Sequence, residues 1–381
     1  MSAPPDTPPD QIAGAPHPRQ AARLFGQGPA EAAFLDAFAT GRLHHAWLLS
    51  GPRGVGKATL AWRVARFLLA TPDPDAEGQG GLFGEAPPPE TMSAPDRLDI
   101  DPDHPVARRL AAGSDPGLFH ITRRVNEKTG RLRDMIVAED VRRLNRFLSL
   151  SATEGGRRVV LIDSADEMNT QAANALLKML EEPPARTTLL LVSHQPAGLL
   201  PTIRSRCRDL RLQPLGEDDM AAALDQAGLP PEAATQAITQ LSGGSVGEAV
   251  RLVALDGAAL YAELTGLAAS LPALDRPRAL ALAQSVAARG AEDRLDLLFA
   301  LTDLLLARLA RTGATGTPPP EAAPGEAETL ARLAPDSRAA RAWAALAQQV
   351  GERARHGRAV NLDPAALVLD TVFKLKDCAT A

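Results

Sequence analysis

A phosphate-binding loop lies near the start of the chain, and one of its chemically important positions is altered. Residues 51–58 read Gly-Pro-Arg-Gly-Val-Gly-Lys-Ala, which fits the pattern G-x-x-x-x-G-K-[ST] at every position but the last. In this pattern the glycines let backbone N–H groups surround phosphates, the lysine reaches the terminal phosphate and the hydroxyl ligates Mg²⁺. The loop retains its glycines and its lysine, which are Gly51, Gly54, Gly56 and Lys57. Because Ala58 stands at the hydroxyl position, the sequence predicts a nucleotide site that has kept its shape and lost part of its chemistry.

The segments around this loop are those that the motif requires. Residues 46–50 form a short apolar run that predicts a buried strand, and residues 58–70 place apolar side chains at helical spacing. Strand, glycine loop and helix follow one another in the order typical of a phosphate-binding loop. Thr59 stands one residue beyond the lost hydroxyl, and on a helix this is a rotation of about 100° away from the phosphates. We therefore expect Thr59 to be a poor substitute.

The composition limits the classes of protein to which the chain can belong. Its 381 residues, 45% of them hydrophobic, are enough for two or three domains with real cores. The net charge of −5 argues against a chain that coats nucleic acid by itself, and 3% aromatic residues argue against a base-stacking platform. The sequence has no run of about 18 apolar residues and no signal-peptide pattern. We therefore expect a cytoplasmic protein with no membrane partner.

Apolar runs alternate with helical segments through the first half of the chain. Besides residues 46–50, strand character occurs at 120–123, 157–163, 187–193 and 208–212. This alternation predicts an α/β fold with a mostly parallel sheet that is covered by helices on both faces. Beyond these runs, short and then long Ala/Leu-rich helical patterns dominate.

These patterns predict a division into four parts. The first residues are rich in Pro, Asp and Ala, which is typical of disorder, and a Pro/Gly-rich stretch inside the α/β part reads as a long insertion. We place a disordered arm at residues 1–18, the α/β domain at 19–214 with its insertion at about 71–118, a small helical lid at 215–272 and a helical C-terminal domain at 273–381.

Four motifs occur in an order that is typical of one family. They are residues 51–57, residues 159–163, the string NALLKMLEEPP at residues 174–184 and the triplet SRC at residues 205–207. Together they closely resemble the clamp-loader branch of the AAA+ ATPases, over about residues 19–255. The resemblance implies an AAA+ α/β domain, a helical lid and a helical collar that holds a five-membered ring of subunits together.

The chain departs from this family at three functional positions. The family's metal-binding hydroxyl is replaced by Ala58. Its second acidic motif ends in Asp-Glu, in which the Asp helps to hold Mg²⁺ and the Glu activates water, but here Asp163 is followed by Ser164. General-base help is worth roughly 10²–10⁴-fold in rate. The lid position at which the family carries a phosphate-touching arginine is Gly247, so the three changes together predict a chain that does not hydrolyse ATP usefully.

Other positions keep the family's residue. Ser193 occupies the sensor position, where its hydroxyl could bond a terminal phosphate or serve a structural role. Arg206, in the triplet, resembles the arginine finger that this family supplies to the ATP of the neighbouring subunit, and such a finger is worth about 10³–10⁵ in rate. We assign the degraded nucleotide site to Gly51, Gly54, Gly56, Lys57, Asp163 and Ser193.

The resemblance also implies ligands and partners. Many relatives carry a four-cysteine zinc module after the phosphate-loop helix, but residues 71–118 contain no cysteine, so we expect no metal. We expect no firmly bound cofactor, with ATP or ADP held weakly at most. A non-hydrolysing stator subunit of a bacterial DNA polymerase III clamp loader would work beside the tau/gamma motor subunits and the delta subunit. Through that complex it would meet the sliding clamp and primed DNA, and any polymerase activity would belong to the complex.

Two other classes of protein remain open. A working AAA+ motor subunit, tau/gamma-like, would need replacements for the lost hydroxyl and acid, for example Thr59 and Glu167. A P-loop kinase or small-molecule NTPase is a third hypothesis, against which the 174–184 string argues, because kinase chemistry does not require it. Simpler roles also remain for single residues: Asp163 could cap the following helix, and Arg206 could belong to a solvated run of arginines.

Overall fold

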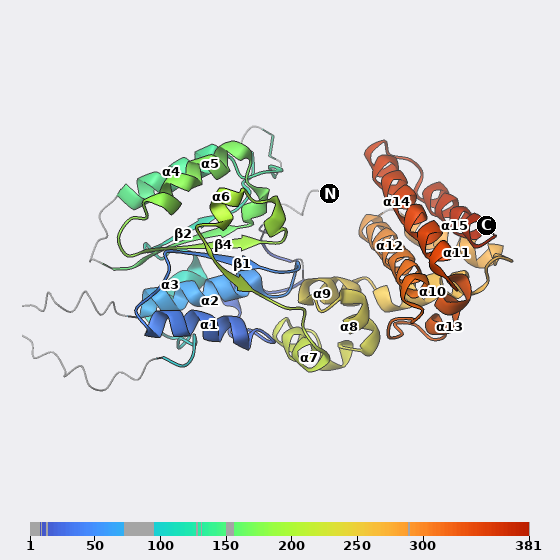
Figure 1. Cartoon of the computed structure of the whole chain (residues 1–381), viewed down its shortest axis with the longest axis horizontal. Helices are drawn as coiled ribbons and strands as arrows, with labels where there is room; N and C mark the ends of the chain where they lie inside the picture. The colour runs from blue at the N-terminus through green and yellow to red at the C-terminus, as the bar shows by residue number, and fades with distance from the viewer. Residues whose placement is uncertain are drawn as a thin grey trace, which may run out of the picture. The chain divides into compact units, whose positions relative to one another are not determined.

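The chain folds into two compact units, which are described separately because each has its own core (Figure 1). The computed structural model describes residues 8, 10–12, 14–71, 95–126, 129–130, 132–149, 156–288 and 290–380. The first unit comprises Met1–Gly228 with Ser245–Gly247, and the second comprises Leu229–Gly244 with Glu248–Ala381. The predicted boundaries of the α/β domain, lid and C-terminal domain stay predictions.

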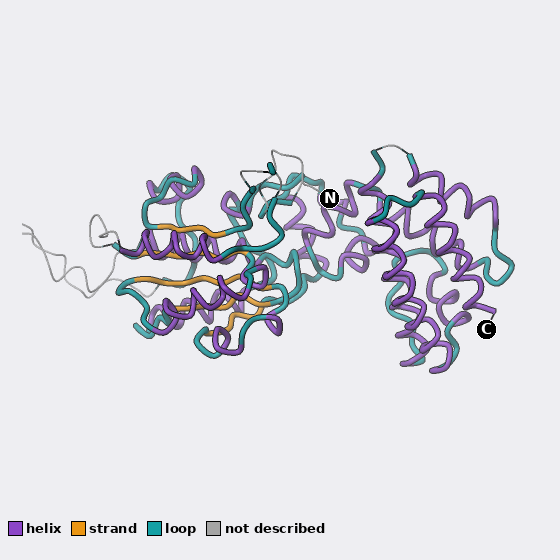
Figure 2. Tube along the Cα trace, turned by 90° about the horizontal axis from the view of Figure 1, so that it is seen from above, coloured by secondary structure: helices purple, strands orange, loops and turns teal. Residues whose placement is uncertain are grey.

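The first unit is built on a five-stranded sheet in the order β2-β3-β4-β1-β5, in which every neighbouring pair is parallel. Figure 2 shows these strands in orange. The strands are β1 (Ala46–Ser50), β2 (Leu118–Ile121), β3 (Arg158–Asp163), β4 (Thr187–Ser193) and β5 (Arg208–Arg211). Because the strands are parallel, their carboxyl ends meet at one edge, and open α/β sheets place their ligand sites there. The register pairs Ser50 with Ser193, and Asp163 with Val192, at this edge.

Helices cover both faces of the sheet, so its strands read as continuous apolar runs. In Figure 1, α4 and α5 lie on one face and α1, α2 and α3 on the other. The helices of this unit are α1 (Gly28–Ala39), α2 (Lys57–Ala70), α3 (Pro105–Ala112), α4 (Ala138–Ser149), α5 (Thr170–Glu181), α6 (Pro201–Arg204) and α7 (Glu217–Gln226). Alternate residues of β3, such as Val160 and Ile162, join a buried cluster with Leu144 of α4 and Leu176 of α5. This is the α/β arrangement that the sequence predicts.

Part of the predicted insertion and part of the predicted arm are packed. Within 71–118, residues 72–94 lie outside the described part, and the rest includes α3, at whose start His104 Nδ1 accepts a hydrogen bond from the backbone of Val106. Within 1–18, residues 1–7, 9 and 13 lie outside the described part. Asp10 and His17 are both buried, with His17 Nε2 2.9 Å from Asp10 Oδ2. The buried contact between Asp10 and His17 therefore holds this segment where composition alone indicates disorder.

The described residues of the second unit form helices joined by loops. They are α8 (Gln236–Ser242), α9 (Val246–Ala254, whose first two residues belong to the first unit), α10 (Gly257–Ala269), α11 (Arg276–Ala287), α12 (Glu292–Thr315), α13 (Glu326–Leu333), α14 (Ser337–Ala359) and α15 (Pro364–Thr380). Two helices approach closely at Gly313 of α12, where an added Cβ would lie 2.6 Å from the backbone carbonyl oxygen of Asp336 and 3.1 Å from the Cβ of Ala340. Only glycine fits this contact with the start of α14.

A buried ion pair fixes the loop between α12 and α13. Glu326 is fully buried, and its carboxylate accepts hydrogen bonds from Tyr261 (2.6 Å), from Arg308 Nε (2.6 Å) and Nη2 (3.1 Å), and from the backbone of Ala322 (2.7 Å). Burial, and then the Glu326 carboxylate, raise the pKa of Tyr261 well above its usual range. Each of these partners compensates the buried carboxylate. Removing one of them would leave a buried charge without full compensation in an apolar core.

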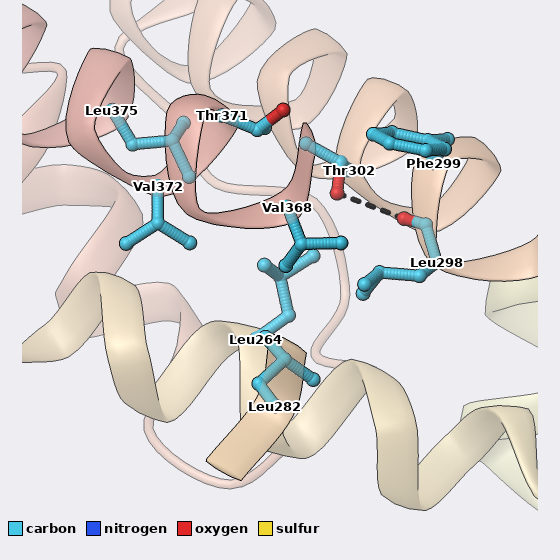
Figure 3. A pocket seen from close by; sticks show the side chains of 9 residues that line it. All are labelled: Leu264, Leu282, Leu298, Phe299, Thr302, Val368, Thr371, Val372 and Leu375. Carbon is cyan, nitrogen blue, oxygen red and sulfur yellow. Dashed lines mark hydrogen bonds between the residues drawn. The ribbon is translucent and has the colours of Figure 1, made fainter. Parts of the chain in front are cut away.

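A small cavity lies among α10, α11, α12 and α15 (Figure 3). Its volume is about 10 Å³, which is roughly the room for one water. The two hydroxyls on its wall bond back to their own helices, Thr302 to the Leu298 carbonyl at 2.8 Å and Thr371 to the Leu367 carbonyl at 2.9 Å. The cavity is therefore a packing gap.

Among the described helices, no single one has the length and apolarity to cross a membrane. The bent pair α9 and α10 has them when its two helices are taken together, by length and composition alone.

Candidate functional site

The loop between β1 and α2 has the backbone of a phosphate-binding loop. Its glycines have positive φ angles, +140° at Gly51, +78° at Gly54 and +98° at Gly56. A Cβ on Gly51 would also lie 2.5 Å from the carbonyl oxygen of Leu212. Glycine adopts such angles without steric cost, so the sequence of residues 51–56 dictates the turn that precedes the helix.

Lys57, the first residue of α2, is turned into its own loop. Its side chain is buried, and its ammonium donates to the carbonyl of Gly51 at 2.8 Å and to that of Pro52. Burial lowers the pKa of Lys57 to about 8, although Asp163 and Asp166 act in the opposite direction. The cation that would reach a terminal phosphate is therefore partly desolvated and held by two backbone carbonyls.

The altered acidic motif forms a hydrogen-bonded link between β3 and β4. Ser164 Oγ donates to Asp163 Oδ1 at 3.2 Å and lies 2.9 Å from Nε2 of His194. Burial, and then the positive charge of Lys57, lower the pKa of His194 to about 4, so the ring is neutral at pH 7 and its Nε2–H can donate to Ser164. Burial raises the pKa of Asp163 to about 6. A hydroxyl that is engaged in this way does not activate a water molecule as a carboxylate does.

Two polar residues at the end of β4, Ser193 and His194, differ in their hydrogen bonding. Ser193 is fully buried, and its Oγ has no hydrogen-bond partner within the part of the chain that the structure describes. The next residue, His194, donates its backbone N–H to Asp166 Oδ1 at 3.0 Å. A buried polar atom that has no partner calls for an explanation, and a hydroxyl directed at a ligand supplies one. Sequence reasoning missed His194, for which the only signal was its place directly after a strand-end serine.

The lid segment packs against the phosphate loop within the first unit. The backbone N–H of Val246 donates to the carbonyl of Gly54 at 3.0 Å. A Cβ on Gly54 would lie 2.1 Å from Ser245 Oγ, and a Cβ on Gly247 would lie 2.4 Å from Cδ1 of Ile12. Residues 245–247 therefore lie against the phosphate loop, and the position at which the family resemblance implies an arginine is occupied by Gly247.

A working motor subunit would need Thr59 and Glu167 to replace the lost hydroxyl and acid, and these two residues are not arranged for that role. Glu167 pairs with Arg123, with Oε2 2.7 Å from Nε, which engages its carboxylate. Burial raises the pKa of Glu167, but this does not free it from the ion pair. Thr59 lies on the first turn of α2, beyond Ala58. Glu167 is therefore engaged in an ion pair and is not free to take over the role of the residue at position 164.

Arg206 lies in a different environment, beyond α6. Its Nη1 donates to the carbonyl of Thr202 at 3.1 Å, and its Nη2 lies 3.1 Å from Oε1 of Glu181. Its side chain is 37% exposed. Burial raises the pKa of the neighbouring Cys207 to about 12, so this thiol is unreactive. The structure thus gathers Lys57, Asp163 and Ser193 at one edge of the sheet and holds Arg206 against α5 and α6.

The strand order, the glycine loop between β1 and α2, and the acid at the end of β3 define an AAA+-type P-loop domain. The model of one family, described as DNA polymerase III, delta subunit, matches residues 26–216, which is half of the chain. The chain belongs to this family.

Curated relatives are named as subunits of the same polymerase. The chain is 40% identical over 212 residues to DNA polymerase III subunit delta' of Pseudomonas aeruginosa, covering 55% of each chain. It is 30% identical over 216 residues to subunit delta' of Escherichia coli, covering 57% of this chain and 56% of that one. It is also 27% identical over 241 residues to subunit gamma of Buchnera aphidicola, covering 62% and 58%. The matched regions span little more than half the length of these relatives.

Proposed function

We propose that the chain is the non-hydrolysing stator, of the delta-prime type, in a bacterial DNA polymerase III clamp loader. It would work beside tau/gamma motor subunits and a delta subunit to place the sliding clamp on primed DNA. One contrast carries the proposal: Lys57 is buried and bonded to its own loop, whereas the Arg206 side chain is 37% exposed. Support also comes from the greater similarity to delta' than to gamma relatives.

In this proposal the chain contributes to ATP hydrolysis at the site of a neighbouring subunit and not at its own site. Arg206 would place its guanidinium on the transferring phosphoryl group of the neighbouring subunit's ATP, where it stabilises the charge that develops in the transition state. The chain's own P-loop would serve as part of an interface or as a weak site for ATP or ADP. Of the groups that hydrolysis needs, Ala58, Ser164 and Gly247 supply none.

The experiment that tests this proposal is Arg206→Ala in a reconstituted complex with motor and delta subunits. ATP turnover at the adjoining motor site, measured in a single round, should fall by about 10³-fold or more. Arg204→Ala is the matched control, because Arg204 is an exposed arginine on the preceding turn. Unchanged turnover in an intact ring that carries the Arg206 variant would overturn the proposal.

The second candidate function is that of a working motor subunit. The presence of Lys57 and the glycine loop favours it, whereas the paired state of Glu167 disfavours it. Steady-state ATP hydrolysis by the purified chain with Mg²⁺, with and without primed DNA, separates the two. Turnover that exceeds a Lys57→Ala control would establish the motor and contradict the stator.

A further inference from the structure

The guanidinium of Arg206 is restrained from two sides, although it lies at the surface. Thr202, on α6, supplies a carbonyl to Nη1, and Glu181, on α5, supplies a carboxylate to Nη2, both at 3.1 Å. A guanidinium carries five N–H donors, so these two contacts leave Nε–H and one N–H on each terminal nitrogen for a further acceptor. An arginine held in this way presents a defined fork, whereas a free arginine side chain samples many rotamers.

The position of Glu181 is not explained by the stability of its own helix. It is the last residue of α5, and a carboxylate at a helix C-terminus interacts unfavourably with the helix dipole. Its side chain is 50% exposed, so burial does not account for it either. Its carboxylate pairs with Arg206, and this contact joins the end of the 174–184 string to the SRC triplet. The two motifs that are most specific to the family therefore meet at one ion pair.

We propose that Glu181 is a positioning residue that orients Arg206 for the neighbouring subunit's ATP. This inference rests on the proposed function, because the finger must act before its orientation can matter. The carboxylate and the Thr202 carbonyl hold the guanidinium, and its three remaining N–H donors stay available for a phosphoryl group. Glu181 itself touches no reacting atom.

The test compares Glu181→Gln, Arg206→Ala and the double variant in the reconstituted ring. For Glu181→Gln, kcat at the adjoining site should fall about 1.5- to 5-fold, the range set by exposed ion pairs, and KM for ATP should not change. The reason is that a finger acts on the transition state more than on bound ATP. The fall should shrink at high salt, because exposed pairs are screened. In the Arg206→Ala background, Glu181→Gln should have no further effect.

Glu182→Gln is the matched control, since Glu182 is an exposed acid that caps the same helix, and it should leave kcat unchanged. A fall of equal size in the Arg206→Ala background would show that Glu181 acts only through folding, which overturns the inference. A rise in kcat would show that Glu181 competes with the phosphate for the guanidinium, which also overturns it. If Arg206→Ala itself has no effect, the proposed function fails and the failure does not come from Glu181.

Discussion

The phosphate loop and the SRC triplet both carry a cation suited to phosphate, but they hold it in opposite ways. Lys57 is 3% exposed and bonds to carbonyls of its own loop, whereas the Arg206 side chain is 37% exposed and rests on two surface contacts. Around Lys57, the hydroxyl, acid and lid arginine of the family are absent. A cation with few catalytic partners can be absorbed into packing, whereas the role in trans that we propose for Arg206 requires its guanidinium to stay reachable.

The largest expected effect lies in the backbone of the phosphate loop. Gly51→Ala should lower the free energy of unfolding of the first unit by about 3 kcal/mol, because it adds a Cβ at a φ of +140° and 2.5 Å from the Leu212 carbonyl oxygen. Hydrogen exchange in urea, read unit by unit, measures this loss. Gly198→Ala is the control and should change little, since nothing lies within 4 Å of its added Cβ. Equal losses would mean that the loop is not held by this contact.

The next effect concerns the acid at the end of β3. Burial raises the pKa of Asp163 to about 6 from 3.8, so between these values the folded chain binds more protons and its stability falls as the pH rises. Asp163→Asn removes this penalty and should stabilise the first unit by about 1–2 kcal/mol at pH 7.5. At pH 3.5 the two proteins should unfold alike. A variant that is less stable at pH 7.5 would show that the carboxylate is favourably paired.

A smaller effect should separate the two cations directly. Lys57→Met should destabilise the first unit by about 1 kcal/mol, because two backbone carbonyls lose their donor while the cost of burying the ammonium is also removed. Arg206→Met should stay within about 0.5 kcal/mol, as is usual for surface substitutions. Urea unfolding of both variants checks this. If Arg206→Met proves the more damaging, the comparison between the two regions is wrong.

The smallest expected effect is the change in ATP turnover when the lost hydroxyl and the lost carboxylate are restored. Ala58→Thr with Ser164→Glu should give no ATP turnover above the Lys57→Ala level in the isolated chain. The reason is that Gly247 still supplies no arginine, and Lys57 remains bonded to its loop. A coupled phosphate-release assay with Mg²⁺ measures it. Clear turnover would mean that those two substitutions alone separate this chain from a motor.

Much of the fold follows from residues that act locally. Apolar runs and glycines at fixed spacing predicted β1, β3 and β4 and the loop before α2, and parallel strands then brought Asp163 and Ser193 to one edge. Contacts between distant segments were not predictable, since they depend on packing. The Ser164–His194 link, the ion pair of Glu181 with Arg206 and the burial of Asp10 in a Pro-rich arm are of this kind.

A substitution at Gly313 should destabilise the second unit selectively. An added methyl group there would meet the backbone carbonyl of Asp336, which cannot rotate away as a side chain can. Gly313→Ala should therefore cost about 1–3 kcal/mol and lower the melting temperature of that unit by several degrees. Such an allele would be temperature-conditional. It would weaken the packing of α12 against α14 and leave Lys57 and Arg206 unaltered, since both residues belong to the first unit.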